Sequence, residues 1–137
     1  MTTEQNKAIV IRFNHECIEQ TNPASFKEIL AVDCINHVAP PGTANGAESM
    51  VNFLSNVLKP GFPDLKVTIL DQVAEGDKVV TRKEIRGTHT GSFMGAAPSN
   101  KTVLIKVIDI IRLRNGQYVE HWASSNLHEV LAEISAN

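Results

Sequence analysis

The stretch VIDIIRLRNGQYVEHW, residues 107–122, predicts two antiparallel β-strands joined by a tight turn at Asn115-Gly116. The first of these strands is aliphatic, yet Asp109 interrupts it. A carboxylate among apolar side chains lowers stability unless a partner offsets the loss of its hydration. We therefore take Asp109 as the first candidate for a functional residue.

The length of the turn decides which residue Asp109 faces on the return strand. A two-residue turn puts Asp109 opposite Trp122, whereas a three-residue turn that includes Arg114 and ends in a bulge puts it opposite His121. We favour the bulged turn, because it gathers Asp109, His121 and the aliphatic Val107 on one face. A slip of one residue would turn the return strand's side chains to the other face.

An aspartate and a histidine in contact across an apolar face are typical of proton transfer near neutral pH. Burial disfavours the charged carboxylate and a histidine partner favours it, so the two effects together tune the pair. The alternatives are a structural Asp–His pair, or an aspartate on the solvent face that bonds a neighbouring arginine. The stretch by itself leaves these interpretations open.

Helical periodicity dominates the first 60 residues. Apolar side chains recur every three or four positions over residues 9–17 and 50–58. Between these two segments, Asn22 followed by Pro23 is a typical helix start. We therefore predict three N-terminal helices.

After residue 64 the apolar period changes from three or four to two, which indicates strands. The predicted strands cover residues 65–74, 77–90, 102–113 and 117–124, with a short earlier strand at 34–38 and a last helix at 126–136. Short turns between strands imply antiparallel pairing. The sequence thus predicts one α+β domain over residues 1–137, in which helices cover a curved sheet.

Composition limits the function classes. The chain has 137 residues and a net charge of −2, with no basic run, so we expect neither nucleic acid nor a membrane surface as a partner. No apolar stretch approaches the length of a membrane span, and the first residues do not resemble a signal peptide. We expect a cytoplasmic protein whose Cys17 and Cys34 are reduced and buried.

The sequence gives no support for a metal or an organic cofactor. The five histidines form no HxH, HxxxH or HExxH motif. The glycine-containing loop GSFMGAAPSNK, residues 91–101, does not join a strand to a helix as phosphate-binding loops do. We predict no cofactor and no metal, and we interpret this loop as a lid at a pocket mouth.

Four motifs together resemble the SnoaL-like polyketide cyclase family, which belongs to the NTF2-like superfamily. They are INHVAPPG (35–42), EGDKVVTR (75–82), GTHTGSFMGAAPS (87–99) and IDIIRLRNGQYVEHW (108–122). The resemblance implies an NTF2-like cone, in which a curved antiparallel sheet is covered on its concave face by three N-terminal helices. It also implies a small-molecule ligand or substrate in the cone and a homodimer through the outer face of the sheet.

Two related enzyme groups suggest roles for individual residues. The strand VIDIIRLRNG is similar to the ketosteroid isomerase strand whose buried aspartate donates a hydrogen bond to an oxyanion, and Asp109 matches that aspartate. The isomerase base matches His37, and the isomerase oxyanion tyrosine matches Phe13. The acid/base aspartate of SnoaL-type cyclases, which close a ring by aldol condensation without a cofactor, maps to Glu120-His121, with His121 favoured by the bulged turn.

Further residues are expected to line the pocket: Phe13, Phe53, Arg82, Val107 and Trp122. For Arg82 the alternative is a solvated charged face shared with Glu84 and Arg86. Arg82 with Asp109 would also supply part of the Asp-Arg-Asp relay of limonene epoxide hydrolases, a third candidate activity. For Trp122 the alternative is packing under the helices or in a dimer interface.

Two main function hypotheses follow. The first is cofactor-independent cyclase or isomerase chemistry on a small, mostly apolar carbonyl compound, in which His37 or His121 removes a proton and Asp109 stabilises the enolate. The second is a small-molecule-binding protein that uses the same cone without chemistry. They differ in whether a base lies within hydrogen-bond reach of an oxyanion partner.

Overall fold

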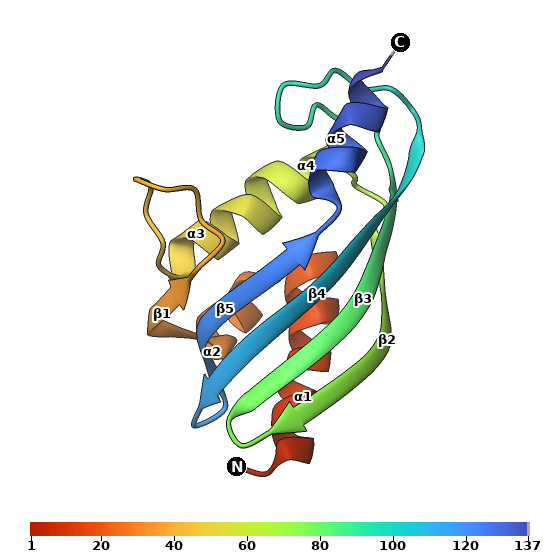
Figure 1. Ribbon diagram of the computed structural model, residues 1–137. Helices are drawn as coiled ribbons and strands as arrows, with labels where there is room; N and C mark the ends of the chain where they lie inside the picture. The colour runs from red at the N-terminus through yellow and green to blue at the C-terminus, as the bar shows by residue number, and fades with distance from the viewer. Residues whose placement is uncertain (137) are drawn as a thin grey trace.

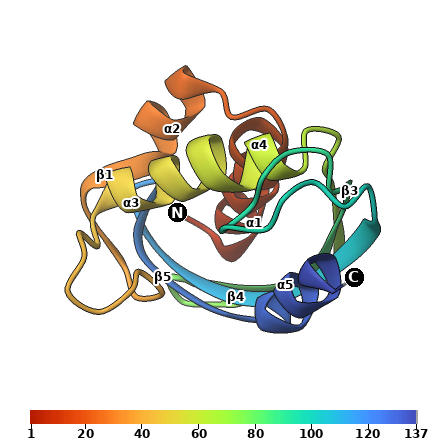
Figure 2. The same cartoon turned by 90° about the horizontal axis from the view of Figure 1, so that it is seen from above.

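A curved five-stranded sheet forms one wall of the molecule, with the strand order β1-β5-β4-β3-β2 (Figures 1 and 2). The computed structural model describes residues 1–136. Its strands are β1 (Leu30–Asn36), β2 (Lys66–Glu75), β3 (Lys78–Thr88), β4 (Thr102–Arg114) and β5 (Gln117–Ser125). The four long strands pair antiparallel as predicted, whereas β1 joins the edge of β5 in parallel.

The predicted N-terminal helices lie on the concave side of this sheet (Figure 2). They are α1 (Thr3–Phe13) with the π-helical segment η1 (Asn14–Glu19), α2 (Pro23–Ile29), and α3 (Ala47–Asn52) with the π-helical segment η2 (Phe53–Leu58) and the short α4 (Lys59–Gly61). The last helix, α5 (Leu127–Ser135), follows β5 at one end of the sheet (Figure 1). The α+β cone predicted from the sequence is confirmed.

Strand alternation explains why one face of the sheet is the core. Successive side chains of a strand point to opposite faces. In β4 the buried or half-buried inner residues are Val103, Ile105, Val107, Asp109, Ile111 and Leu113. Asp109 therefore belongs to an otherwise aliphatic inner row, as its place in the sequence predicted.

The β4–β5 hairpin differs from both predicted registers. Asn115 and Gly116 both have positive φ, 52° and 80°, so they form a two-residue turn of the type that suits hairpins. A bulge at Val119 then shifts the pairing by one residue, and Asp109 lies opposite Ala123. The pairing with His121 that we favoured is wrong, because the bulge lies in β5 and not in the turn.

The bulge nevertheless keeps His121 on the inner face. His121 pairs with Ile111, which points inward, and it is therefore a diagonal neighbour of Asp109. The prediction that Asp109 and His121 share one face is confirmed.

The loop between β3 and β4 closes one end of the cone. His89 is fully buried, and its Nδ1 accepts a hydrogen bond from the backbone N–H of Ser99, which ties the two ends of the loop together. Gly91 crosses the end of α4 so closely that an added Cβ would lie 2.0 Å from the Pro60 carbonyl oxygen. The loop is thus packed against the helix that faces the sheet.

Candidate active site

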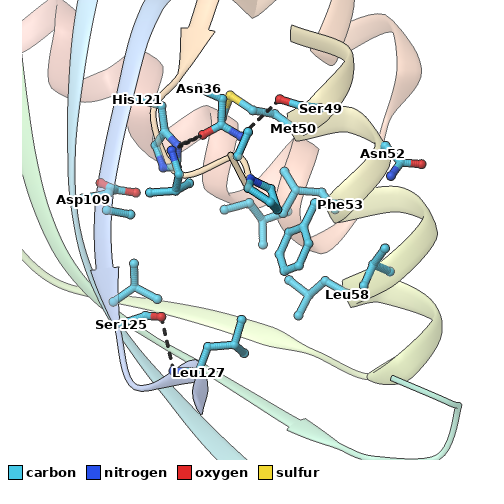
Figure 3. Close-up of a pocket in the computed structure, with 18 of the residues that line it drawn as sticks. Asn36, Ser49, Met50, Asn52, Phe53, Leu58, Asp109, His121, Ser125 and Leu127 are labelled. Carbon is cyan, nitrogen blue, oxygen red and sulfur yellow. Dashed lines mark hydrogen bonds between the residues drawn. The ribbon is translucent and has the colours of Figure 1, made fainter. Parts of the chain in front are cut away.

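A cavity of about 1070 Å³ lies between the inner face of the sheet and the α3–η2 helix (Figure 3). This volume is at the upper end of what small-molecule sites show. Phe13, Phe53 and Val107, all predicted to line the pocket, do line it. Most of the other lining side chains are also apolar, so the few polar groups among them define the chemistry.

Asp109 forms a buried ion pair with Lys83. The Lys83 Nζ lies 2.9 Å from Asp109 Oδ2 and donates a second hydrogen bond, of 2.7 Å, to Asn14 Oδ1. Both members of the pair are only 4% exposed. Lys83 Nζ is the donor in this contact, so Asp109 is here a hydrogen-bond acceptor and not the donor we predicted.

Asn14 is held for this contact by the helix that carries it. It begins the π-helical segment η1, and its Nδ2 donates to the Val10 carbonyl oxygen at 2.8 Å, which leaves Oδ1 for Lys83. Single-turn π-helical segments occur frequently at functional sites. The sequence did not reveal Asn14 or Lys83 as site residues, although strand alternation already placed Lys83 on the face opposite Arg82.

Within residues 1–136, the second carboxylate oxygen of Asp109 has no hydrogen-bond partner. Oδ1 is buried and makes no hydrogen bond with any residue in the described part of the chain. A buried acceptor without a partner lowers stability by about 1–3 kcal/mol. Asp109 lines the cavity, and Oδ1 is the carboxylate oxygen that Lys83 does not contact.

His121 enters the cavity beside Asp109 and is fixed by Asn36 (Figure 3). Its Nδ1 lies 2.9 Å from Asn36 Oδ1, and the two residues are paired neighbours across β5 and β1. Asn36 Nδ2 donates to Ser49 Oγ at 3.2 Å, and Ser49 donates in turn to the Gly46 carbonyl oxygen at 2.6 Å. The sequence did not predict Asn36 or Ser49 as site residues, because residues so far apart in the chain give no local signal.

His121 is a weak base in this position. Burial lowers its pKa from 6.5 to about 4, although the negative charge of Asp109 acts in the opposite direction. The imidazole is therefore neutral at physiological pH.

His37 and Trp122 lie on the outer face of the sheet, and neither lines the cavity. Their rings stack with centroids 4.8 Å apart, and His37 Nε2 lies 2.8 Å from Glu120 Oε2. The inward position on β1 belongs to Asn36, so its neighbour His37 must point outward. Trp122 points outward because its neighbour His121 points inward, and the expected pocket positions of His37 and Trp122 are wrong.

Arg82 is also outside the cavity. Its guanidinium donates two hydrogen bonds to the Asp71 carboxylate, at 3.1 and 3.0 Å, on the exposed face. The charged-face alternative is therefore correct for Arg82, and it makes no relay with Asp109. The cation beside Asp109 is Lys83, the residue that follows Arg82 in the sequence.

Tyr118 is a further inner residue that the sequence did not reveal. It is 1% exposed and lines the cavity, and its ring stacks on Phe13 with centroids 4.5 Å apart. Burial, followed by the charge of Asp109, raises the pKa of the Tyr118 phenol well above 10. Tyr118 stays protonated and completes the wall behind Asp109.

Over residues 1–136, no group of three His, Cys, Asp or Glu side chains is arranged to hold a metal ion. In the same part of the chain, no helix has the length and apolarity needed to cross a bilayer.

Known proteins resemble this chain over nearly its whole length. The model of the SnoaL-like polyketide cyclase family matches residues 8–134. A candidate SnoaL-like polyketide cyclase from Jannaschia sp. CCS1 is 28% identical, with a TM-score of 0.86 over 98% of this chain and 94% of that one. IdmH from Streptomyces antibioticus, a candidate polyketide cyclase, is 29% identical, with a TM-score of 0.79 over 96% and 99% of the two chains.

TsrD from Streptomyces laurentii, at 22% identity and a TM-score of 0.85 over 100% of this chain and 99% of that one, shares the fold. A search of curated proteins found no match. The family model covers far more than half of the chain, and the cone fold agrees with it. The chain therefore belongs to the SnoaL-like polyketide cyclase family.

Proposed function

We propose that this protein catalyses cofactor-independent proton transfer next to a carbonyl group, as cyclases and isomerases do, on a small and mostly apolar compound. The observation that carries the proposal is Asp109 Oδ1, a buried acceptor without a partner in the described chain, on the wall of a large apolar cavity. Membership of a family named for polyketide cyclases supports the choice of a carbonyl compound.

In the proposed step, Asp109 Oδ1 takes the proton from the carbon next to the carbonyl. The C–H bond breaks, its electron pair forms the enolate, and the negative charge moves to the carbonyl oxygen. The Lys83 ammonium stays beside the site while the charge passes from Asp109 to the ligand, so the net charge does not change. Two of the three Lys83 N–H groups already have partners, and we assign the third to the enolate oxygen.

This assignment moves the role of base from the histidines to Asp109. His37 lies on the opposite face of the sheet, and the His121 ring is already fixed by its hydrogen bond to Asn36, whereas Asp109 keeps an oxygen without a partner in the described chain beside the Lys83 cation. Lys83 replaces Asp109 as the group that stabilises the enolate. His121 then contributes a hydrogen-bonding position next to the base.

The test is deuterium exchange at the acidic carbons of 2-tetralone, an apolar ketone, followed by NMR in D2O. The wild type should exchange these protons faster than buffer does. Asp109→Asn should lower the enzyme-dependent rate by about 10²- to 10⁴-fold, because loss of a general base has effects of this size. Asp71→Asn, which removes a carboxylate from the exposed face, should leave the rate unchanged.

A second variant separates loss of the base from loss of the fold. Asp109→Asn leaves the buried Lys83 charge poorly compensated, so the double variant Lys83→Met/Asp109→Asn removes both charges and keeps similar shapes. It should fold and should not catalyse exchange. Undiminished exchange in a variant without the Asp109 carboxylate would disprove the role of Asp109.

The competing function is ligand binding without chemistry, which the apolar cavity lining also favours. Tight binding of ketones by the wild type with no exchange above the buffer rate would establish it. We further propose that the protein is a cytoplasmic homodimer that needs no metal or organic cofactor. Exchange should therefore persist after treatment with a chelator.

A further inference from the structure

We infer that the cavity selects neutral, mostly apolar ligands that carry a hydroxyl group, and that Asn36 is the residue that sets this preference. The inference rests on the proposed function only in that both use the same cavity. It concerns which hydrogen-bonding groups a ligand must offer there.

The orientation of the Asn36 amide is fixed by two contacts. The backbone N–H of Val38 donates to Asn36 Oδ1 at 3.3 Å. A backbone N–H can only donate, so the Asn36 atom that faces it must be the amide oxygen. On the other side, Ser49 uses its proton on the Gly46 carbonyl and so accepts from Asn36 Nδ2. If the amide were flipped, the NH₂ group of Asn36 would face the N–H of Val38, and two donors would lie against each other.

This orientation fixes the proton on His121. Asn36 Oδ1 can only accept, so the Nδ1 of His121 must carry the proton that bridges the 2.9 Å between them. In a neutral imidazole only one nitrogen is protonated, and with a pKa of about 4 the ring is neutral at pH 7. The Nε2 of His121 is therefore a lone-pair acceptor.

Two acceptors then stand side by side on the cavity wall. Within residues 1–136 the His121 ring is hydrogen-bonded through Nδ1 alone, and Asp109 Oδ1 is buried without a partner. An ether or ketone oxygen at His121 would meet a lone pair and lose its hydration without compensation. A hydroxyl donates there and gains a hydrogen bond, which for neutral groups amounts to about 0.5–1.5 kcal/mol.

Anions are excluded by the same arrangement. The Lys83 charge is balanced by Asp109 at 2.9 Å, and no other lysine and no arginine among residues 1–136 lines the cavity. A ligand carboxylate would face the Asp109 carboxylate and the His121 lone pair. The preferred ligand is thus a neutral alcohol, phenol or enol.

The experiment compares probes that bind without having an acidic C–H to exchange. By calorimetry at pH 7, 2-naphthol should bind the wild type about three- to tenfold more tightly than 2-methoxynaphthalene, the factor expected for one neutral hydrogen bond. The anion 2-naphthoate should bind more weakly than either. Equal binding of the hydroxyl and methoxy probes, or binding of neither, would overturn the inference.

Variants of Asn36 test its role. In Asn36→Leu either ring nitrogen of His121 can carry the proton. The ratio of the affinities for 2-naphthol and 2-methoxynaphthalene should therefore fall towards one. Asn36→Asp puts a carboxylate against Nδ1, which favours protonation of both ring nitrogens, so the preference should fall in this variant as well. Ser49→Ala, the matched control, leaves the Val38 contact that orients Asn36 and should keep the preference.

Nitrogen-15 NMR of the histidine side chains gives a readout that does not depend on binding. In the wild type the unprotonated nitrogen of His121 should be Nε2, with the signal identified by its absence from His121→Gln. Finding Nδ1 unprotonated would overturn the inference even if Asn36→Leu fails to fold. Since naphthols cannot undergo the proposed reaction, a hydroxyl preference without ketone exchange would refute the proposed function alone.

Discussion

Lys83 and Asp109 form an ion pair that water hardly reaches, with both residues only 4% exposed. Such pairs add little net stability, yet removal of one member leaves a buried charge and is strongly destabilising. We therefore expect Lys83→Met to lower the free energy of unfolding by about 3–5 kcal/mol, measured by urea denaturation at pH 7.

The control is the exposed pair of Arg82 with Asp71. Arg82→Met should change stability by less than about 1 kcal/mol, as exposed ion pairs do. The double variant Lys83→Met/Asp109→Leu should recover most of the loss, because no buried charge remains. Similar losses for Lys83→Met and Arg82→Met would mean that water reaches the Lys83–Asp109 pair.

His121 makes stability depend on pH in a defined window. Its pKa is about 4 in the folded protein, lowered from 6.5, so between these values the unfolded chain binds a proton that the folded protein does not. The contribution of the neutral His121 to the free energy of unfolding is fully present above pH 6.5, falls as the pH decreases, and is lost below pH 4. It amounts to at most about 3 kcal/mol.

His121→Gln should remove this contribution. The difference in unfolding free energy between wild type and His121→Gln should vary over that window. A His121→Gln difference that is flat from pH 7 to pH 4 would show that the imidazole titrates normally.

At the residue scale, the sequence could reveal Asp109 but not its partner. Asp109 is conspicuous because its neighbours in β4 are aliphatic. Lys83 lies in a run of charged residues, VVTRKEIRG, where nothing but alternation separates it from Arg82. Hydrogen bonds between distant residues, such as those of Asn14 and Asn36, depend on how the helices lie over the sheet.

The β4–β5 hairpin shows what can be foreseen at the scale of elements. The Asn115-Gly116 turn is readable, because these residue types tolerate positive φ. The bulge at Val119 is not, because no glycine or other local signal accompanies it. The turn alone therefore gave the wrong partner for Asp109, while strand alternation gave the right face.

The loop over residues 89–101 depends on one close backbone contact. Gly91→Ala would put a methyl group 2.0 Å from the Pro60 carbonyl oxygen, and the backbone there cannot move as a side chain can. We expect a loss of about 1–3 kcal/mol in unfolding free energy, as for other overpacked sites, and faster proteolysis of the loop.

Gly46→Ala is the matched control. The nearest atoms that a methyl group there would meet belong to the Glu48 carboxylate, at 3.1 Å, and that flexible side chain can turn away. Its effect on stability should be clearly smaller. If the Gly91 and Gly46 variants behave alike, the loop does not pack against α4 as described.

At the scale of the whole molecule, the fold was the most predictable feature. The change of apolar period near residue 64 separates helices from strands, and four motifs matched the family whose model covers residues 8–134. The enclosed volume was not predictable. It depends on the curvature of the sheet, which no single segment encodes.

The outer face of the sheet carries exposed apolar side chains, among them Leu70, Val73 and Ile108. We expect this face to form the proposed homodimer, because exposed apolar surface is commonly buried in association. Light scattering after size exclusion should give twice the chain mass for the wild type. Ile108→Glu should shift the protein towards monomer, and a monomeric wild type would rule the dimer out.

The most direct test of the proposed proton transfer is a crystal structure of the wild type with 2-tetralone bound. Proton abstraction needs the reacting atoms to be about 3–3.5 Å apart. The account predicts an acidic carbon of the ketone at that distance from Asp109 Oδ1, with the carbonyl oxygen towards Lys83. A ketone bound in the cavity with both acidic carbons turned away from Asp109, or bound elsewhere on the protein, would contradict it.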